Sequence, residues 1–378
     1  MLTPDEWSQI SDQAVKIYSD LELEIIQEIA ERIANFNYAN TVVQNSIKIA
    51  EEMGLMYEDI INLVAKYNSI SENRVREIFE SAGIKSLKFD DEIYKIAGVT
   101  VLPIKQSESF WKLLEAMVIR TNFNLNNLVL TTANTVQTDF YNAVNQAYME
   151  VSTGLKSYTQ AIGDAVEKVS KTGAIIEYPS GVKRSLESAV RMNILTSVNQ
   201  TCGELQEMRA KEVGWDLMEI TAHSGARPSH AEWQGKIVSL SGKRGYLSKS
   251  DIGYGTATGF KGVNCRHDWF PYYKGSSKTY TNKELNKLKN EKVQYNGKKI
   301  SLYDATQIQR RYEREIRNVK KEIVGKQAIL TSKNKEIDIK QIENDLKMLN
   351  AKKSQKTQQL DSLLKQTNFR KDYSRLKI

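Results

Sequence analysis

Few side chains in this sequence can bind a transition metal through nitrogen or sulfur, and most of them lie close together. The chain has three histidines and two cysteines, and four of these five residues fall within 45 positions. These four are His223, His230, Cys265 and His267, in the order His-x6-His and then Cys-x-His. Zinc binds four such ligands tetrahedrally, and two close pairs joined across a strand and a loop make a site of this kind. The cluster therefore predicts a structural zinc site, as one of three interpretations.

The other two interpretations need no metal. In one, each histidine forms a hydrogen bond within a small aromatic core, as buried polar groups usually do, and the available tryptophans are Trp215, Trp233 and Trp269. In the other, His230 and His267 act as acid and base, while Arg227 or Lys236 stabilises a phosphate, as in a metal-free nuclease. No activated Ser or Cys nucleophile is visible. The residues alone leave all three interpretations open.

Two predicted strands and a glycine-rich loop position this cluster. Residues 216–223, "DLMEITAH", alternate between two faces, and residues 236–242, "KIVSLSG", follow as a second strand. Residues 241–262 hold six of the chain's twenty glycines, which favours a loop with special backbone angles. The glycine spacing matches neither a dinucleotide fingerprint nor a Walker loop. A metal bound by both pairs would tie this loop to the sheet.

Helical patterns precede the cluster. Thr3 and Glu6, with Pro4 between them, form the signature of a capping box at a helix start. Apolar residues then recur at helical spacing through residues 1–170, which indicates helix packed on helix. Ser185 follows a Pro/Gly break and is placed to cap a long helix that ends near Val213.

The C-terminal stretch from Thr281 has helical propensity and two coiled-coil-like seams separated by a polar break. The seams are Ile308, Tyr312, Ile316, Val319, Ile323, Leu330 and then Ile339, Ile342, Leu346, Leu349, Leu360, Leu363. The break permits an antiparallel helical hairpin or two helices that dock separately on partners. The chain carries a formal net charge of +8, and this stretch holds 25 Lys and Arg against 12 Asp and Glu. Such a surface attracts phosphate or an acidic protein face.

A chain of 378 residues exceeds the usual size of one hydrophobic core, so several regions are expected. We predict a mainly α protein with a small central α+β domain: a helical region at 1–170, an α+β domain with the Gly-rich loop at 171–280, and a basic helical tail at 281–378. No signal peptide or spanning segment of roughly 20 apolar residues is visible, so no membrane association is expected. Two cysteines in so long a chain favour a reducing compartment over a disulfide scaffold.

Three stretches carry a resemblance to a known family. They are "YPSGVKRSLESAVRMNILTSVNQTCGELQ" (178–206), "AHSGARPSHAEWQGKIVSLSG" (222–242) and "GVNCRHDWFPYYKG" (262–275). The sequence resembles the phage minor capsid protein 2 family, which is similar to the Mu F-like head morphogenesis proteins of tailed phages and prophages.

The Mu F-like pattern tends to have a Cys-x2-Cys before a Gly-Lys pair, and later a His-Pro-x-Cys-Arg-Cys. Here Gly235-Lys236 matches the Gly-Lys pair, His230 stands at the second cysteine and Arg227 at the first. Gly262 stands at the late histidine, and Cys265-Arg266-His267 replaces Cys-Arg-Cys. Three positions keep a metal-binding side chain and two lose it, and His223 offers a fourth donor.

The resemblance implies a virion component present in a few copies inside the head near the portal, made in the host cytoplasm and acting in head assembly or in DNA packaging and ejection. Its expected partners are the portal and other capsid proteins, and packaged DNA through nonspecific contact with residues 281–378. It implies no established enzyme. The alternative from another class is a nuclease or other phosphate-directed enzyme that uses His230 and His267.

Overall fold

The computed structural model describes residues 1–38, 42–172, 174–178 and 180–377. The chain forms two compact units, each assembled from three separate stretches of sequence. Unit 1 comprises Met1–Ala14, Glu72–Leu125 and Arg191–Gln307. Unit 2 comprises Val15–Ser71, Asn126–Val190 and Ile308–Ile378. These units differ in kind from the predicted segments 1–170, 171–280 and 281–378, which follow changes of pattern along the sequence. The three segments remain a prediction.

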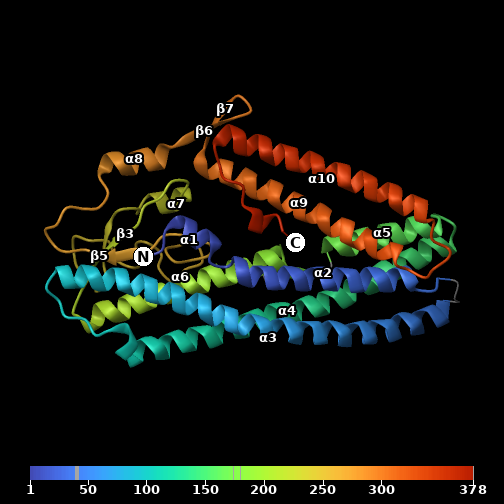
Figure 1. Cartoon of the computed structure of the whole chain (residues 1–378), viewed down its shortest axis with the longest axis horizontal. Coiled ribbons are helices and arrows are strands. Elements are labelled where there is room, and N and C mark those ends of the chain that lie inside the picture. The colour runs from blue at the N-terminus through green and yellow to red at the C-terminus, as the bar shows by residue number, and fades with distance from the viewer. Residues whose placement is uncertain (39–41, 173, 179, 378) are drawn as a thin grey trace. The chain divides into compact units, whose positions relative to one another are not determined.

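Helices dominate the chain before the cluster, which confirms the predicted mainly α class (Figure 1). They are α1 (Pro4–Gln9), α2 (Asp12–Asn35), α3 (Val42–Ile96), α4 (Glu108–Ser152), α5 (Tyr158–Thr172) and α6 (Leu186–Glu212), with a 3-10 turn η1 (Ile104–Gln106). The predicted capping box starts α1: the Thr3 hydroxyl accepts the Glu6 N–H, and the Glu6 carboxylate accepts the Thr3 N–H at 2.9 Å. Among the described residues, no helix combines the length and apolar character needed to cross a bilayer.

The long helix α6 begins where the sequence predicts. The short antiparallel strands β1 (Ile175–Glu177) and β2 (Lys183–Ser185) precede it. Ser185 Oγ then accepts the Ser188 N–H at 3.3 Å, which satisfies one of the amide groups left unpaired at a helix start.

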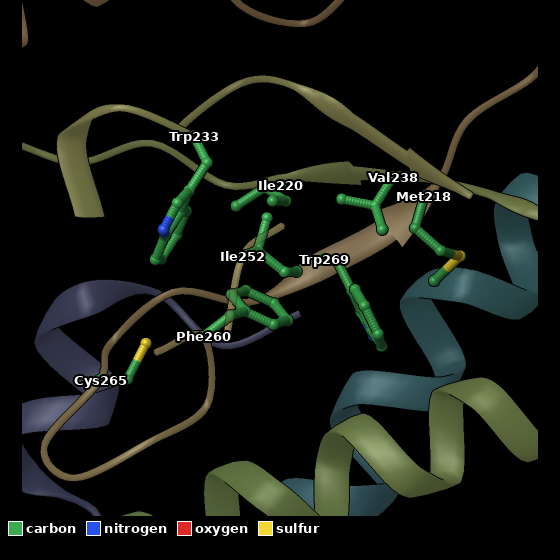
Figure 2. Close-up of a cluster of buried hydrophobic side chains, with 8 residues drawn as sticks. All are labelled: Met218, Ile220, Trp233, Val238, Ile252, Phe260, Cys265 and Trp269. Atoms are coloured by element: carbon green, nitrogen blue, oxygen red, sulfur yellow. The ribbon is translucent and has the colours of Figure 1, made fainter. Parts of the chain in front are cut away.

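The small α+β part of unit 1 is a three-stranded antiparallel sheet. Its strands are β3 (Leu217–Ile220), β4 (Ile237–Ser239) and β5 (Trp269–Pro271), in the order β4-β3-β5. The predicted strands around β3 and β4 are confirmed, whereas β5 has no counterpart in the prediction. Figure 2 shows the apolar cluster beneath the sheet, which consists of Met218, Ile220, Trp233, Val238, Ile252, Phe260, Cys265 and Trp269.

Part of the stretch expected to be helical is a β-hairpin. After α8 (Asn282–Asn290), strands β6 (Lys292–Tyr295) and β7 (Lys298–Ser301) pair antiparallel. The turn residues Asn296 and Gly297 have φ of 47° and 76°, the two positive angles of a type I′ turn. The Asn-Gly turn decides the local structure here, despite a lysine-rich composition that favours helix.

In unit 2, helices α9 (Leu302–Leu330) and α10 (Ile339–Thr367) run side by side (Figure 1). Three ion pairs join them: Lys326–Asp345 at 2.7 Å, Lys352–Glu322 at 3.6 Å and Lys356–Glu315 at 2.9 Å. Because residue numbers rise on one helix as they fall on the other, the pair is an antiparallel hairpin. Its apolar seam includes Ile316, Leu360 and Leu364, and the 3-10 turn η2 (Tyr373–Arg375) follows.

Candidate metal centre

The sheet brings the two halves of the His/Cys cluster to one place. In an antiparallel pair, the end of one strand meets the start of the other, so His223, just after β3, lies beside His267, just before β5. The pairing of Ile220 with Trp269 fixes this register. Residue His230 belongs to a short helix, α7 (Pro228–Ala231), in the connection that returns to the sheet to form β4.

Three of the four predicted ligands converge. One ligand atom from each of His230, Cys265 and His267 lies within 4.8 Å of the others, and all three residues are buried. Cys265 Sγ lies 3.6 Å from His267 Nδ1. Zinc bonded at about 2.0–2.3 Å to such atoms separates them by roughly 3.5 Å. A small rotation of the side chains would therefore let one ion bind all three.

Hydrogen bonds fix the orientation and the protonated nitrogen of two of the imidazoles. His230 Nε2 lies 2.8 Å from the carbonyl oxygen of Thr258, and His267 Nε2 lies 3.0 Å from Gln234 Oε1. Because both partners are acceptors, each Nε2 carries the proton and each Nδ1 keeps its lone pair. A ligand histidine typically donates its second N–H in this way to a carbonyl or carboxylate oxygen.

The fourth predicted ligand, His223, is adjacent but lies outside the convergent group. Its ring centroid is 4.3 Å from that of His267, and its backbone N–H donates to Gln234 Oε1 at 2.8 Å. Nδ1 lies 2.9 Å from the Ser224 carbonyl oxygen, so Nδ1 is the protonated nitrogen. Nε2 is buried and makes no hydrogen bond. An unprotonated, buried nitrogen next to the cluster is the donor that a fourth coordination position would use.

Burial keeps the cluster uncharged. It lowers the pKa of His223 and His230, and it lowers the pKa of His267 well below the usual range, with the neighbouring histidines adding to the effect. Neutral imidazoles are the form that binds metals. Burial also raises the pKa of the Cys265 thiol, whereas a bound cation would favour the thiolate.

The aromatic contacts expected in the metal-free interpretation are also present. The Trp233 ring lies 4.6 Å from both the His230 and the His267 ring. Trp269 belongs to the same buried cluster, and Trp215 packs against it. The two interpretations therefore share their contacts and differ in whether the unprotonated nitrogen atoms and the sulfur of Cys265 hold a cation.

The catalytic interpretation finds less support in this geometry. His230 is 3% exposed and His267 is 1% exposed, so a phosphodiester cannot reach them without rearrangement of the chain. Arg227 donates to the Val263 carbonyl oxygen at 3.2 Å, and Lys236 is exposed. The charge of Arg227 is close enough to lower the pKa of both imidazoles further, but its guanidinium is hydrogen-bonded to the backbone, and Lys236 gives no sign of joining the group.

Two structural features of the site have no clear signal in the sequence. Gln234 accepts hydrogen bonds from both the His223 backbone and His267, yet nothing in "EWQGK" distinguishes it from a surface glutamine. Lys261 and Asp268 form a buried ion pair at 2.6 Å close to the cluster. Their burial can be known only from the fold, because charged residues are rarely buried.

The fold and site define a mainly helical protein with a small sheet that gathers a His/Cys cluster. Residues 2–364 match the family described as Phage minor capsid protein 2, and the chain belongs to this family. It is similar to a structural protein of Lactococcus phage LL-H, with 27% identity over 319 residues that cover 79% of this chain and 81% of that protein. No solved structure matches the chain. The protein is thus a phage structural protein and a virion component.

Proposed function

We propose that this minor structural protein lies inside the phage head near the portal and acts in head assembly or in DNA packaging and ejection. The observation that carries the proposal is the family match over residues 2–364. The helical surfaces offer docking sites for the portal and other capsid proteins, and the basic residues within 281–378 suit contact with packaged DNA. The likeness of residues 171–280 to Mu F-like proteins, and the seams expected of a coiled coil in α9 and α10, support the same role. Assembly would take place in the host cytoplasm.

Cross-linking of intact phage particles, followed by mass spectrometry, tests this location. We expect peptides of the protein to cross-link to the portal and to the inner surface of the capsid protein. DNA-filled and emptied particles should be compared, because a component used in ejection would leave the head with the DNA. Absence from purified particles, or cross-links confined to the outer surface, would contradict the proposed location.

We also propose that the His/Cys cluster holds a structural zinc ion. Three ligand atoms within 4.8 Å, with two imidazoles whose Nδ1 atoms are unprotonated, support it. A bound ion would cross-link the segments before β4 and β5. His230, Cys265 and His267 would be the ligands, with His223 as the fourth donor.

Metal analysis of purified protein tests this site separately from the location. We expect about one zinc per chain in the wild type and a loss of zinc in Cys265→Ser. Cys202→Ser, which changes the other buried cysteine away from the cluster, is the matched control and should keep its metal. A wild-type protein without zinc above background, whose melting temperature does not rise when zinc is added, would exclude the site.

The nuclease alternative is tested with the same protein. Wild type and His230→Ala are incubated with DNA and with RNA, with and without a chelator. Cleavage by the wild type that His230→Ala abolishes would overturn the purely structural role. The burial of His230 and His267 predicts no such cleavage.

A further inference from the structure

We infer that residues 282–301, which comprise α8 and the β6–β7 hairpin and are called here the basic arm, bind the phosphate backbone of duplex DNA. The inference rests on the proposed function, which brings the protein close to packaged DNA. It narrows the proposed contact from the whole of 281–378 to these 20 residues.

The basic arm carries a dense and exposed positive charge. It holds six lysines and no arginine against two glutamates. Every one of the lysines is exposed: Lys283, Lys287, Lys289, Lys292, Lys298 and Lys299. Lys274 and Lys278, just before the arm, are exposed as well. When lysines at this density neutralise DNA phosphates, the cations condensed on the DNA are released, and this release favours binding.

The two acidic side chains of the arm have structural roles. Glu284 accepts the Thr281 N–H and hydroxyl at 2.8 Å each in a capping box, and Glu291 accepts the Ser224 hydroxyl at 2.5 Å. Among the arm's lysines, all within the described residues, an ion pair is found for Lys289, with Glu232 at 2.8 Å. The remaining five lysines therefore keep their charge available for a partner.

Contacts within unit 1 hold the arm in place. Leu285 packs so closely on Gly235 that a Cβ there would lie 2.9 Å from the leucine methyl carbons. Just before the arm, the buried carboxylate of Glu219 on β3 accepts the Thr279 N–H at 2.9 Å. These contacts already order the arm in the free protein. Binding to DNA would therefore cost less conformational entropy than the binding of a disordered segment.

The hairpin distributes its lysines on both faces. Lys299 pairs with Gln294 and lies diagonally from Lys292 on one face, and Lys298 pairs with Tyr295 on the other. Diagonal neighbours of this kind are about 7–8 Å apart, which spans roughly two phosphates of one DNA strand. A two-stranded ribbon also fits the major groove of B-DNA, which is about 12 Å wide.

The helical tail that follows is less available, although it holds more basic residues. Residues 302–378 contain 19 Lys and Arg against 10 Asp and Glu, a lower density of net charge. Many of these basic groups are in ion pairs within unit 2. Examples are Arg310 with Glu313, Lys321 with Glu22, and Lys356 with Glu315. Ion pairs of this kind reduce the field that DNA would meet.

The distribution of charge along the arm favours duplex DNA over an acidic protein. The arm's positive charges are all lysines, which bind phosphate and carboxylate groups alike as point charges, so the residue type does not decide the partner. However, the charges repeat along two elements rather than gather in one pocket, which suits a polymer of evenly spaced phosphates.

Fluorescence anisotropy with a short, mixed-sequence DNA duplex tests the inference on the full chain. The arm variant Lys292→Glu/Lys298→Glu/Lys299→Glu is compared with the tail variant Lys335→Glu/Lys340→Glu/Lys347→Glu, which changes three exposed lysines and the same net charge. Affinity is measured over a series of salt concentrations. A melting temperature close to that of the wild type shows that a variant folds. If one of the two variants does not fold, the same three lysines are replaced by glutamine in both.

We expect the arm variant to bind at least about tenfold more weakly, and its salt slope to fall by about 0.9 for each phosphate that the arm no longer neutralises. The tail variant should change both quantities much less. Equal losses in the two variants, or no loss in either, would overturn the inference. So would an arm variant that keeps its DNA affinity but loses binding to polyglutamate, which would assign the arm to an acidic protein. These outcomes are independent of where cross-linking places the protein in the particle.

Discussion

Replacing Lys261 by methionine should destabilise unit 1 strongly. The Lys261 side chain is 1% exposed and Asp268 is 0% exposed, with 2.6 Å between Nζ and Oδ1. Nζ also donates to Asn199 Oδ1 at 3.1 Å. In Lys261→Met the carboxylate stays buried, retains the Trp269 N–H, and still has no partner at Oδ2. Removing one member of a buried pair costs about 3–5 kcal/mol, which lowers the folding equilibrium constant at least a hundredfold.

A double variant separates the charge effect from the loss of packing. Lys261→Met combined with Asp268→Asn removes both charges of this pair, so most of the lost stability should return, and a coupling of about 2–3 kcal/mol is expected. Lys249→Met is the matched control, because Lys249 pairs with Glu207 at 2.9 Å but is 37% exposed. It should cost less than about 1 kcal/mol.

Denaturant unfolding followed by tryptophan fluorescence is the assay, because Trp233 and Trp269 lie in the buried cluster of unit 1. The midpoint and slope of this transition give the stability of that unit without assuming that both units unfold together. A Lys261→Met variant within about 1 kcal/mol of the wild type would refute the reasoning, and so would a double variant no more stable than the single one.

Three further predictions concern local structure. Gly259→Ala should disorder the glycine-rich loop, because its Cβ would lie 2.0 Å from the Gly253 carbonyl oxygen; limited proteolysis should then cut the loop, and unchanged resistance would contradict this packing. Ser185→Ala should cost about 1 kcal/mol through loss of the α6 cap, measured by thermal unfolding. The hydrogen bond from Lys85 lowers the pKa of Glu6 from 4.5 to about 2, so its stabilisation is complete above pH 4.5 and is lost as the pH falls toward 2. Glu6→Gln should flatten the acid-side stability curve in that range.

Features with local causes could be predicted from the sequence. The caps at Thr3 and Ser185 depend on residues within three positions. The strand at 217–220 is buried at all four positions, but it lies in a stretch, 216–223, whose residue types alternate. The hairpin at 292–301 also has a local signal, an Asn-Gly turn between alternating apolar residues, but its lysine content favours a helix. The strand Trp269–Pro271 is only three residues long, and its pairing with β3 determines it more than any pattern of its own.

The His/Cys cluster shows which part of the site could not be predicted from the sequence. The types and spacing of the four residues indicate a cluster, and three of them do meet. Convergence depends on the pairing of β3 with β5, which joins positions about 50 residues apart. The position of His223 beside the group rather than in it depends on the Gln234 side chain, whose amide holds the His223 backbone.

Two buried polar residues of helix α6 hold the backbone around His267 in place. Asn199 and Gln206 are fully buried, which conflicts with a simple apolar face. Their amide groups donate to the carbonyl oxygens of Cys265 and Trp269, each at 2.8 Å. These two bonds fix the backbone on either side of His267, so α6 directly positions the segment that carries Cys265 and His267.

Gly203, on the same helix, provides the space for the buried lysine. A Cβ at Gly203 would lie 2.8 Å from Lys261 Cδ, so a side chain there would displace Lys261 from Asp268. Lys261 has φ of 57°, a left-handed conformation that non-glycine residues adopt only when surrounding contacts hold them. The ion pair, the close approach to α6 and the hydrogen bond to Asn199 together supply those contacts. The glycine-rich loop is therefore tied to α6 through Lys261 as well as to the sheet through the His/Cys cluster, and a bound metal would strengthen only the second connection.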